Sequence, residues 1–144
     1  MLKGIDPLLG PELLHILRAM GHGDELVIVD ANYPATANAK RLVRLDGVDA
    51  PRALQAILTL LPLDDFVEAP LAFMQMVGDS QTIPEVVSQM QKVAEQAEQK
   101  PLKAEHIDRF AFYERARQGY AIVATSERRL YGNVIVKKGV IRSA

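Results

Sequence analysis

The residue best suited to chemistry in this sequence is a histidine between two glycines, Gly21-His22-Gly23. Imidazole groups titrate near neutral pH, so they can take up and release a proton in turn, as general acid–base catalysis requires. The glycines remove side-chain bulk beside the ring and let a ligand approach it closely. A second polar group, Asp30, follows the apolar residues 26–29 and could accept hydrogen bonds from hydroxyl groups.

The elements around these two groups must position them. A helical pattern stops at Gly21, which we expect to take the left-handed conformation that closes a helix. Residues 26–29 are apolar and mostly β-branched, which predicts a strand buried on both faces. Open α/β sheets bind ligands beyond the carboxyl ends of their strands, so Asp30 stands where a site is expected. We expect His22 and Asp30 to face the same end of the sheet.

Other interpretations of these residues remain open. His22 can instead interact with the helix dipole, and Asp30 can cap the turn that follows it. His22, Asp24 and Asp30 also offer nitrogen and oxygen ligands for a metal ion. The chain has no cysteine, which excludes disulfides, a thiol nucleophile and a thiolate metal site.

The composition is that of an ordinary globular protein. At 144 residues the chain fits one domain, residues 1–144, and can bury about 70% of its unfolded surface. Its charges are spread and sum to −1, so we expect no nucleic-acid partner and solvated charges at residues 127–129 and 137–138. Asp6 and Pro7 interrupt the N-terminal apolar residues, which argues against a signal peptide. No apolar run approaches the roughly 20 residues that span a membrane, and we expect a cytoplasmic protein.

Helical and strand patterns alternate along most of the chain. Helical spacing of apolar residues is found near residues 11–20, 49–61, 84–99 and 110–117. Strand patterns are found near residues 26–29, 41–45, 70–77, 120–125 and 133–136. This alternation predicts a single-domain α/β protein with three layers, in which helices cover both faces of a largely parallel or mixed central sheet.

Separated motifs together resemble one known family. They are Gly21-His22-Gly23-Asp24, Asp30-Ala31-Asn32, the run from Arg109 to Ala116, Tyr131-Gly132-Asn133, and the run from Lys137 to Val140. The chain resembles the RbsD/FucU family of ribose pyranases and fucose mutarotases over about its first 34 and last 35 residues. At Arg109 and at Tyr131-Gly132-Asn133 it is similar to the fucose branch.

The resemblance implies an activity and a role for several residues. It implies that the protein interconverts the α and β anomers of a monosaccharide, above all L-fucose, without a metal or other cofactor. His22 would be the proton donor or general acid–base group. The residues that would bind the sugar are Asp30, Arg109, Tyr131, Gly132 and Asn133.

The residue types fit this chemistry independently of the resemblance. Anomer exchange needs one proton to leave the anomeric hydroxyl and another to reach the ring oxygen, which suits an imidazole. A carboxylate, a guanidinium, a phenol and an amide can orient sugar hydroxyls. Arg109 can equally pair with Asp108, and Tyr131 and Asn133 can be ordinary edge-strand residues. A non-catalytic sugar-binding or transport-associated protein and a ribose pyranase are the alternative functions.

The resemblance also implies an assembly. Family members form closed homo-oligomers, commonly decameric rings, with the sugar site near a subunit boundary. Residues 126–133 would then lie close to a neighbouring chain, and one subunit would complete the pocket of another.

Overall fold

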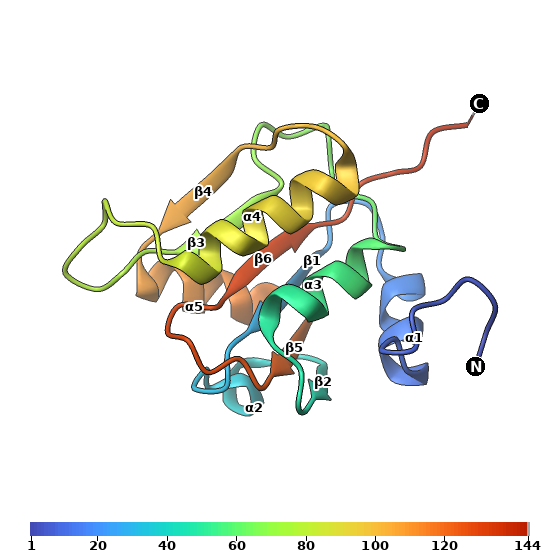
Figure 1. Ribbon diagram of the computed structural model, residues 1–144, viewed down its shortest axis with the longest axis horizontal. Coiled ribbons are helices and arrows are strands. Elements are labelled where there is room, and N and C mark those ends of the chain that lie inside the picture. Colours follow the sequence, from blue (N-terminus) through green and yellow to red (C-terminus); the bar gives the residue numbers. More distant parts are fainter. Residues whose placement is uncertain (144) are drawn as a thin grey trace.

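A computed structural model of the chain describes residues 1–143. Six strands form one sheet (Figure 1): β1 (Glu25–Val29), β2 (Leu42–Leu45), β3 (Leu71–Met74), β4 (Ala104–Ile107), β5 (Ala121–Thr125) and β6 (Val134–Lys137). Their order is β2-β5-β1-β6-β3-β4, and β6 alone runs antiparallel to its neighbours. The carboxyl ends of β1 to β5 therefore meet at one edge of the sheet, the carboxyl edge, together with the beginning of β6. The opposite side is the amino edge.

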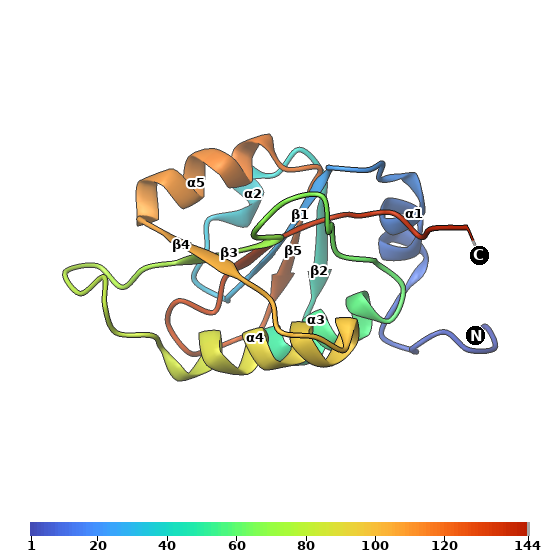
Figure 2. The ribbon, with the colours of Figure 1, turned by 90° about the horizontal axis from the view of Figure 1, so that it is seen from above.

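Five helices surround the sheet: α1 (Pro11–Ala19), α2 (Ala35–Asn38), α3 (Ala50–Leu58), α4 (Glu85–Glu98) and α5 (Arg109–Gln118). In Figure 2, α3 and α4 cover one face and α2 and α5 the other. Alternate residues of β1 point to opposite faces. Leu26 and Ile28 join the cluster under α3 and α4, whereas Val27 and Val29 join the cluster under α5. The predicted three-layer α/β fold with a mixed sheet is confirmed, as is the strand buried on both faces.

The first helix ends differently from the prediction. α1 ends at Ala19, and Met20 is extended, with φ −60° and ψ 140°. The left-handed residue is Gly23, with φ 88°, so the expectation for Gly21 was wrong. The Asp24 carboxylate accepts from the Gly21 N–H at 2.7 Å, and the Asp24 N–H donates to the Gly21 carbonyl at 3.1 Å. Residues 21–24 thus form a tight turn, with His22 at its second position.

Two elements carry too little local pattern to be predicted. The helix α2 is only one turn long, which is too short to show helical periodicity. The strand β4 is the outermost strand on one side of the sheet and has the polar residues Glu105 and His106 at its centre, both exposed. Because these two adjacent side chains point to opposite faces and are both exposed, β4 shows neither a continuous apolar run nor an apolar–polar alternation, and its pattern resembles that of a loop.

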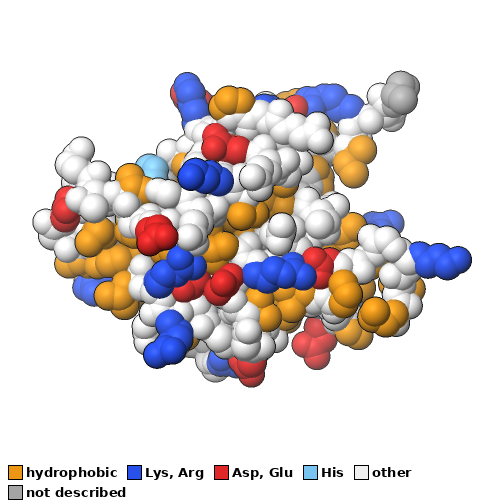
Figure 3. All heavy atoms as spheres, in the orientation of Figure 1, with side chains coloured by type: hydrophobic (Ala, Val, Ile, Leu, Met, Phe, Trp, Pro, Cys, Tyr) orange, Lys and Arg blue, Asp and Glu red, His pale blue; other side chains and the backbone are white. Residues whose placement is uncertain are grey.

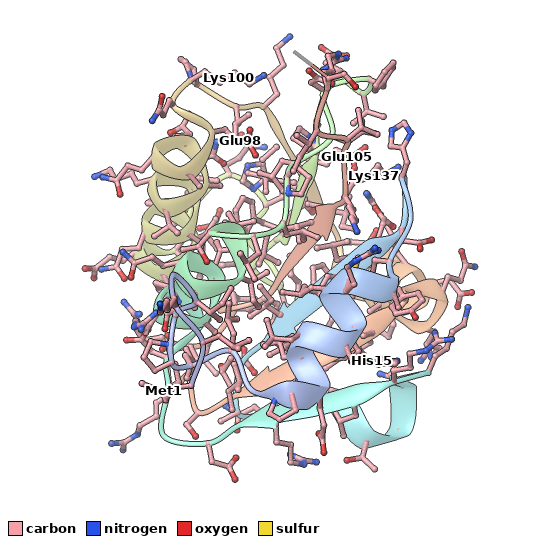
Figure 4. All side chains as sticks on the ribbon, turned by 90° about the vertical axis from the view of Figure 1, so that its right-hand side faces the viewer. Met1, His15, Glu98, Lys100, Glu105 and Lys137 are labelled. Carbon is pink, nitrogen blue, oxygen red and sulfur yellow. The ribbon has the colours of Figure 1, made fainter. Side chains whose placement is uncertain are left out.

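The surface carries both signs of charge. On the face shown in Figure 3, Lys and Arg side chains are interspersed with Asp and Glu side chains. His15 is exposed on α1, as its place in the helical pattern predicts (Figure 4). Within residues 1–143, the helices are too short or too polar to cross a membrane.

We expect replacement of the cap of α3 to destabilise the fold. The Asp49 carboxylate accepts a hydrogen bond from the Arg52 N–H at 2.9 Å at the N-terminus of this helix. Asp49→Ala should lower the free energy of unfolding by about 1 kcal/mol, measured by urea denaturation. Asp46→Ala, in the exposed turn after β2, is the control; equal stability of the two variants would contradict the capping role.

Candidate functional site

At the amino edge, His22 is paired with a buried carboxylate. Its Nε2 atom lies 3.0 Å from Oδ1 of Asp64. The His22 side chain is 43% exposed, whereas that of Asp64 is only 3% exposed. The arrangement therefore holds one side of the imidazole against the protein and leaves the ring accessible to a ligand.

The charge state of Asp64 determines which nitrogen of His22 is free. Burial raises the pKa of Asp64, but hydrogen bonds from the Phe66 N–H and from His22, together with the charge of His22, outweigh it, so its pKa is lowered. An ionised carboxylate has no proton to donate, so Nε2 must carry the hydrogen of this bond. The Nδ1 atom of the neutral ring is then unprotonated and can accept a proton from a ligand.

An exposed aromatic ring lies beside the pair. The ring centroids of Phe66 and His22 are 5.1 Å apart, and Phe66 is 64% exposed. The guanidinium of Arg142 lies 4.9 Å from the centroid of the Phe66 ring and also forms a salt bridge with Asp65. An apolar and charged surface thus surrounds the imidazole at the amino edge.

A second group of polar residues lies at the carboxyl edge. Asp30 follows β1 directly and is buried, as is Asn133 at the start of β6. The Asp30 N–H donates to Oδ1 of Asn133 at 2.9 Å, and Oδ1 of Asp30 accepts from the Asn32 N–H at 3.0 Å. Burial raises the pKa of Asp30, and hydrogen bonds from Asn32 and Asn133 offset part of that effect.

Tyr131 and Arg109 join this group through the loop after β3. The Tyr131 hydroxyl accepts a hydrogen bond from the Val77 N–H at 3.0 Å. Val77 and Arg109 both line a hollow of about 370 Å³. Tyr131 has a left-handed backbone, with φ 66°, which is costly for a bulky residue and persists only where its surroundings enforce it. Five of the six predicted site residues therefore lie at this edge of the sheet: Asp30, Arg109, Tyr131, Gly132 and Asn133.

An ion pair between the buried Glu127 and the half-buried Arg129 holds the loop that carries Tyr131. Both carboxylate oxygens of Glu127 bind Arg129, at 2.9 and 3.0 Å, and Oε2 also accepts from the Ala50 N–H. These bonds from Arg129 and Ala50 lower the pKa of Glu127 to about 2 despite its burial. A methyl group on Gly132 would approach Cγ of Glu127 to 2.7 Å, so the loop packs tightly on this pair. The expectation of a solvated Glu127 was wrong, since its side chain is 3% exposed.

His22 does not lie with the other five residues, and the expectation that it shares an end of the sheet with Asp30 was wrong. His22 precedes β1 and Asp30 follows it, so the whole strand separates them. Five extended residues span roughly 13 Å between the first and the last Cα atom. Within one chain the two side chains cannot contact the same small sugar or the same metal ion.

The partner of His22 had no signal in the sequence. Asp64 lies 42 residues beyond His22 and follows an apolar stretch, so only the folded chain brings them together. Two other residues close to the predicted site have structural contacts. His106 stacks on Phe73 at 5.7 Å, and Tyr113 packs edge-on against Tyr33 at 5.3 Å.

Fold and site together define a small α/β protein with polar groups that can bind hydroxyls at one edge of a mixed sheet, and an accessible histidine paired with a buried carboxylate at the other. Residues 3–141 match the RbsD / FucU transport protein family. The chain belongs to this family.

Proteins of known name and structure resemble the chain over almost its whole length. The L-fucose mutarotase of Actinobacillus pleuropneumoniae serotype 5b is 45% identical over 140 residues, which are 97% of either chain. That of Histophilus somni strain 2336 is 46% identical with the same coverage. The fucose mutarotase of Streptococcus pneumoniae, solved in complex with L-fucose, is 42% identical with a TM-score of 0.91 over 98% of this chain and 100% of that one. Bacillus subtilis RbsD, solved with D-ribose, is 20% identical with a TM-score of 0.73 over 99% and 100%, and shares the fold.

Neutralising Glu127 should weaken the loop at the carboxyl edge. Because its pKa falls from 4.5 to about 2 on folding, its charge stabilises the native state above pH 4.5, and this stabilisation is lost as the pH falls toward 2. Glu127→Gln should cost about 2 kcal/mol at pH 7, and the difference from the wild type should shrink below pH 4.5 in denaturant titrations. Glu114→Gln, at an exposed pair with Arg117, is the control. A deficit of Glu127→Gln that does not change between pH 7 and pH 3 would contradict this role.

Proposed function

We propose that this protein is an L-fucose mutarotase, which interconverts the α and β anomers of the sugar by proton transfer through His22. The observation that carries the proposal is an accessible imidazole hydrogen-bonded to a buried, ionised Asp64. The relatives named L-fucose mutarotase, which are similar over 97% of their length, support the choice of sugar.

The proposed reaction uses His22 as both base and acid. Nδ1 takes the proton of the anomeric hydroxyl, the bond between the anomeric carbon and the ring oxygen breaks, and an open aldehyde forms. The imidazolium returns the proton to the ring oxygen. One imidazole can serve both the hydroxyl oxygen and the ring oxygen, because both are bonded to the anomeric carbon in the closed ring. Rotation of the aldehyde and reclosure by the reverse steps give the other anomer. The Asp64 carboxylate stabilises the transient imidazolium, and such catalysis contributes roughly 10²- to 10⁴-fold.

The groups at the carboxyl edge would orient the sugar. The Asp30 carboxylate can accept from two hydroxyls, and the Arg109 guanidinium can donate to hydroxyls or to the ring oxygen. Asn133 and Tyr131 add an amide and a phenol beside them. Gly132 lies between these two side chains and, because it carries no side chain, lets the loop that holds them pack against Glu127.

Two copies of the chain are required for a complete pocket on this proposal. His22 of one subunit would dock at the carboxyl edge of the next, because β1 keeps it away from Asp30 of its own chain. Exposed aromatic rings at both edges support such a contact, with Phe66 64% exposed beside His22 and Phe110 70% exposed beside Arg109. A contact between two different edges is heterologous, and such contacts form a ring where the rotation from one subunit to the next closes, and an open filament where it does not. A closed homo-oligomer, such as a decamer, is the assembly we propose.

A second candidate is a sugar-binding protein associated with transport, without catalysis. The description of the family as transport proteins favours it. The two candidates differ in whether the protein accelerates exchange between anomers. Saturation transfer between the two anomeric proton signals of L-fucose measures this exchange, and binding without exchange would favour the second candidate.

Removal of the His22 imidazole should abolish most of the exchange. The catalysed rate of His22→Ala should fall on the order of 100-fold or more in saturation-transfer experiments, because the base and acid are both lost. Its fold should persist, since His22 lies in a turn outside the helices and strands and its side chain is 43% exposed. His15→Ala, at an exposed position on α1, is the control and should keep the wild-type rate. Wild-type exchange by folded His22→Ala would remove this residue from the mechanism.

Mixing two inactive variants should restore part of the activity. In a mixed oligomer of His22→Ala and Asn133→Ala chains, about a quarter of the contacts join an intact His22 to an intact Asn133, if the chains combine at random in equal amounts. Light scattering should give a mass well above 15.9 kDa, and the mixed oligomer about a quarter of the wild-type rate.

The matched control mixes Arg109→Ala with Asn133→Ala. Both changes lie at the carboxyl edge, so every contact carries one defect and no activity should return. An inactive oligomer that contains both His22→Ala and Asn133→Ala chains would contradict the shared pocket, and a fully active monomer would contradict the assembly.

A further inference from the structure

Residues 137–139 lie between the two chain segments that carry His22 and Asp64. On one side they hold the Asp64 segment. The Asp64 N–H donates to the Lys137 carbonyl at 3.0 Å, and the Gly139 N–H donates to the Pro62 carbonyl at 2.8 Å. A methyl group on Gly139 would come within 2.7 Å of Cα of Asp64, so the two segments are in tight contact.

On the other side the same residues hold the His22 turn. The Gly23 N–H donates to the Lys138 carbonyl at 2.8 Å, and the Lys138 N–H donates to the Asp24 carbonyl at 2.9 Å. Both bonds are formed by residues 23 and 24, which directly follow His22 in the turn. Backbone bonds to residues 137–139 therefore set the distance between the imidazole and the Asp64 carboxylate.

The Lys138 side chain also holds the chain on the N-terminal side of His22. Its ammonium donates to the Leu17 carbonyl at 3.0 Å and to the Met20 carbonyl, at the C-terminal end of α1. Helix C-terminal carbonyls have no partner within the helix, and a cation there is favoured by the helix dipole. The charged runs of the sequence were expected to be solvated, but this lysine is half-buried.

We propose that Lys138 is a positioning residue for His22, in addition to the catalytic and sugar-binding residues, and this rests on the proposed mutarotase function. Its backbone holds the turn after His22, and its ammonium holds the end of the helix before it. Lys138 does not enter the reaction. It keeps Nε2 on Asp64 and thereby keeps Nδ1 free and directed to the sugar.

The consequence is specific to the chemical step. Loss of the ammonium frees the chain before His22 but leaves the carboxyl edge, where the sugar would bind, unchanged. A misplacement of about 1 Å can cost on the order of 10²-fold in rate. We therefore expect kcat to fall while KM changes little.

The test compares Lys138→Met, which keeps the length of the side chain but removes the charge, with Lys138→Arg, which keeps the charge. With L-fucose as the probe, kcat of Lys138→Met should fall at least about tenfold at a KM within about twofold, and Lys138→Arg should recover most of the rate. Lys103→Met removes an ammonium from an exposed pair with Glu68 and is the matched control. Thermal melts set a temperature at which all variants are folded.

A second measurement does not depend on catalysis. The chain has three histidines, so His15→Ala and His106→Ala assign the ring nitrogen signals of His22 in ¹⁵N spectra. The wild type should show protonated Nε2 and unprotonated Nδ1, and Lys138→Met should show a mixture of both tautomers. Wild-type nitrogen signals and wild-type kcat in Lys138→Met would overturn the positioning role, and so would a loss confined to KM. Absence of exchange in the wild type would instead overturn the proposed function, while the nitrogen signals would still decide the role of Lys138.

Discussion

The antiparallel pairing of β6 with β1 determines where the candidate site residues of this protein lie. In the register of these strands, Glu25 faces Lys137 and Ile28 faces Val134. The beginning of β6 therefore lies beside the end of β1, which brings Asn133 to Asp30. Its end lies beside the beginning of β1, which brings Lys138 to the turn of His22. A parallel β6 would have placed Asn133 beside His22 and separated it from Asp30.

The sequence predicts those parts of the fold that depend on local patterns. The apolar residues 26–29 predict β1 because a strand covered on both faces needs no polar alternation. The place of Asp30 at the carboxyl edge follows from the direction of that strand. The same strand places His22 at the other edge, because a residue before a strand lies at its opposite end. Two residues that are close in sequence are thus far apart in space, because an extended strand separates them.

The rest of the site depends on contacts between distant segments. The role of Asp64 depends on His22, and the burial of Glu127 depends on the Ala50 N–H, 77 residues away. In a single sequence both carboxylates resemble solvated surface groups. Lys138 is similar, since its ammonium binds carbonyls of α1 more than 100 residues earlier. Charged residues whose partners lie so far away have no local pattern by which to be recognised.

On the proposal of a pocket shared between subunits, the placement of His22 and Asp30 at opposite edges has a consequence for the number of pockets in an assembly. An open row of subunits joined edge to edge has one pocket fewer than it has chains, because the first and last subunits each present an unmatched half. A closed ring has as many pockets as chains. The loss is greatest for the smallest assemblies, since an open dimer would use only half of its histidines. Ring closure would thus give each chain one full pocket without any residue beyond those that form the proposed contact.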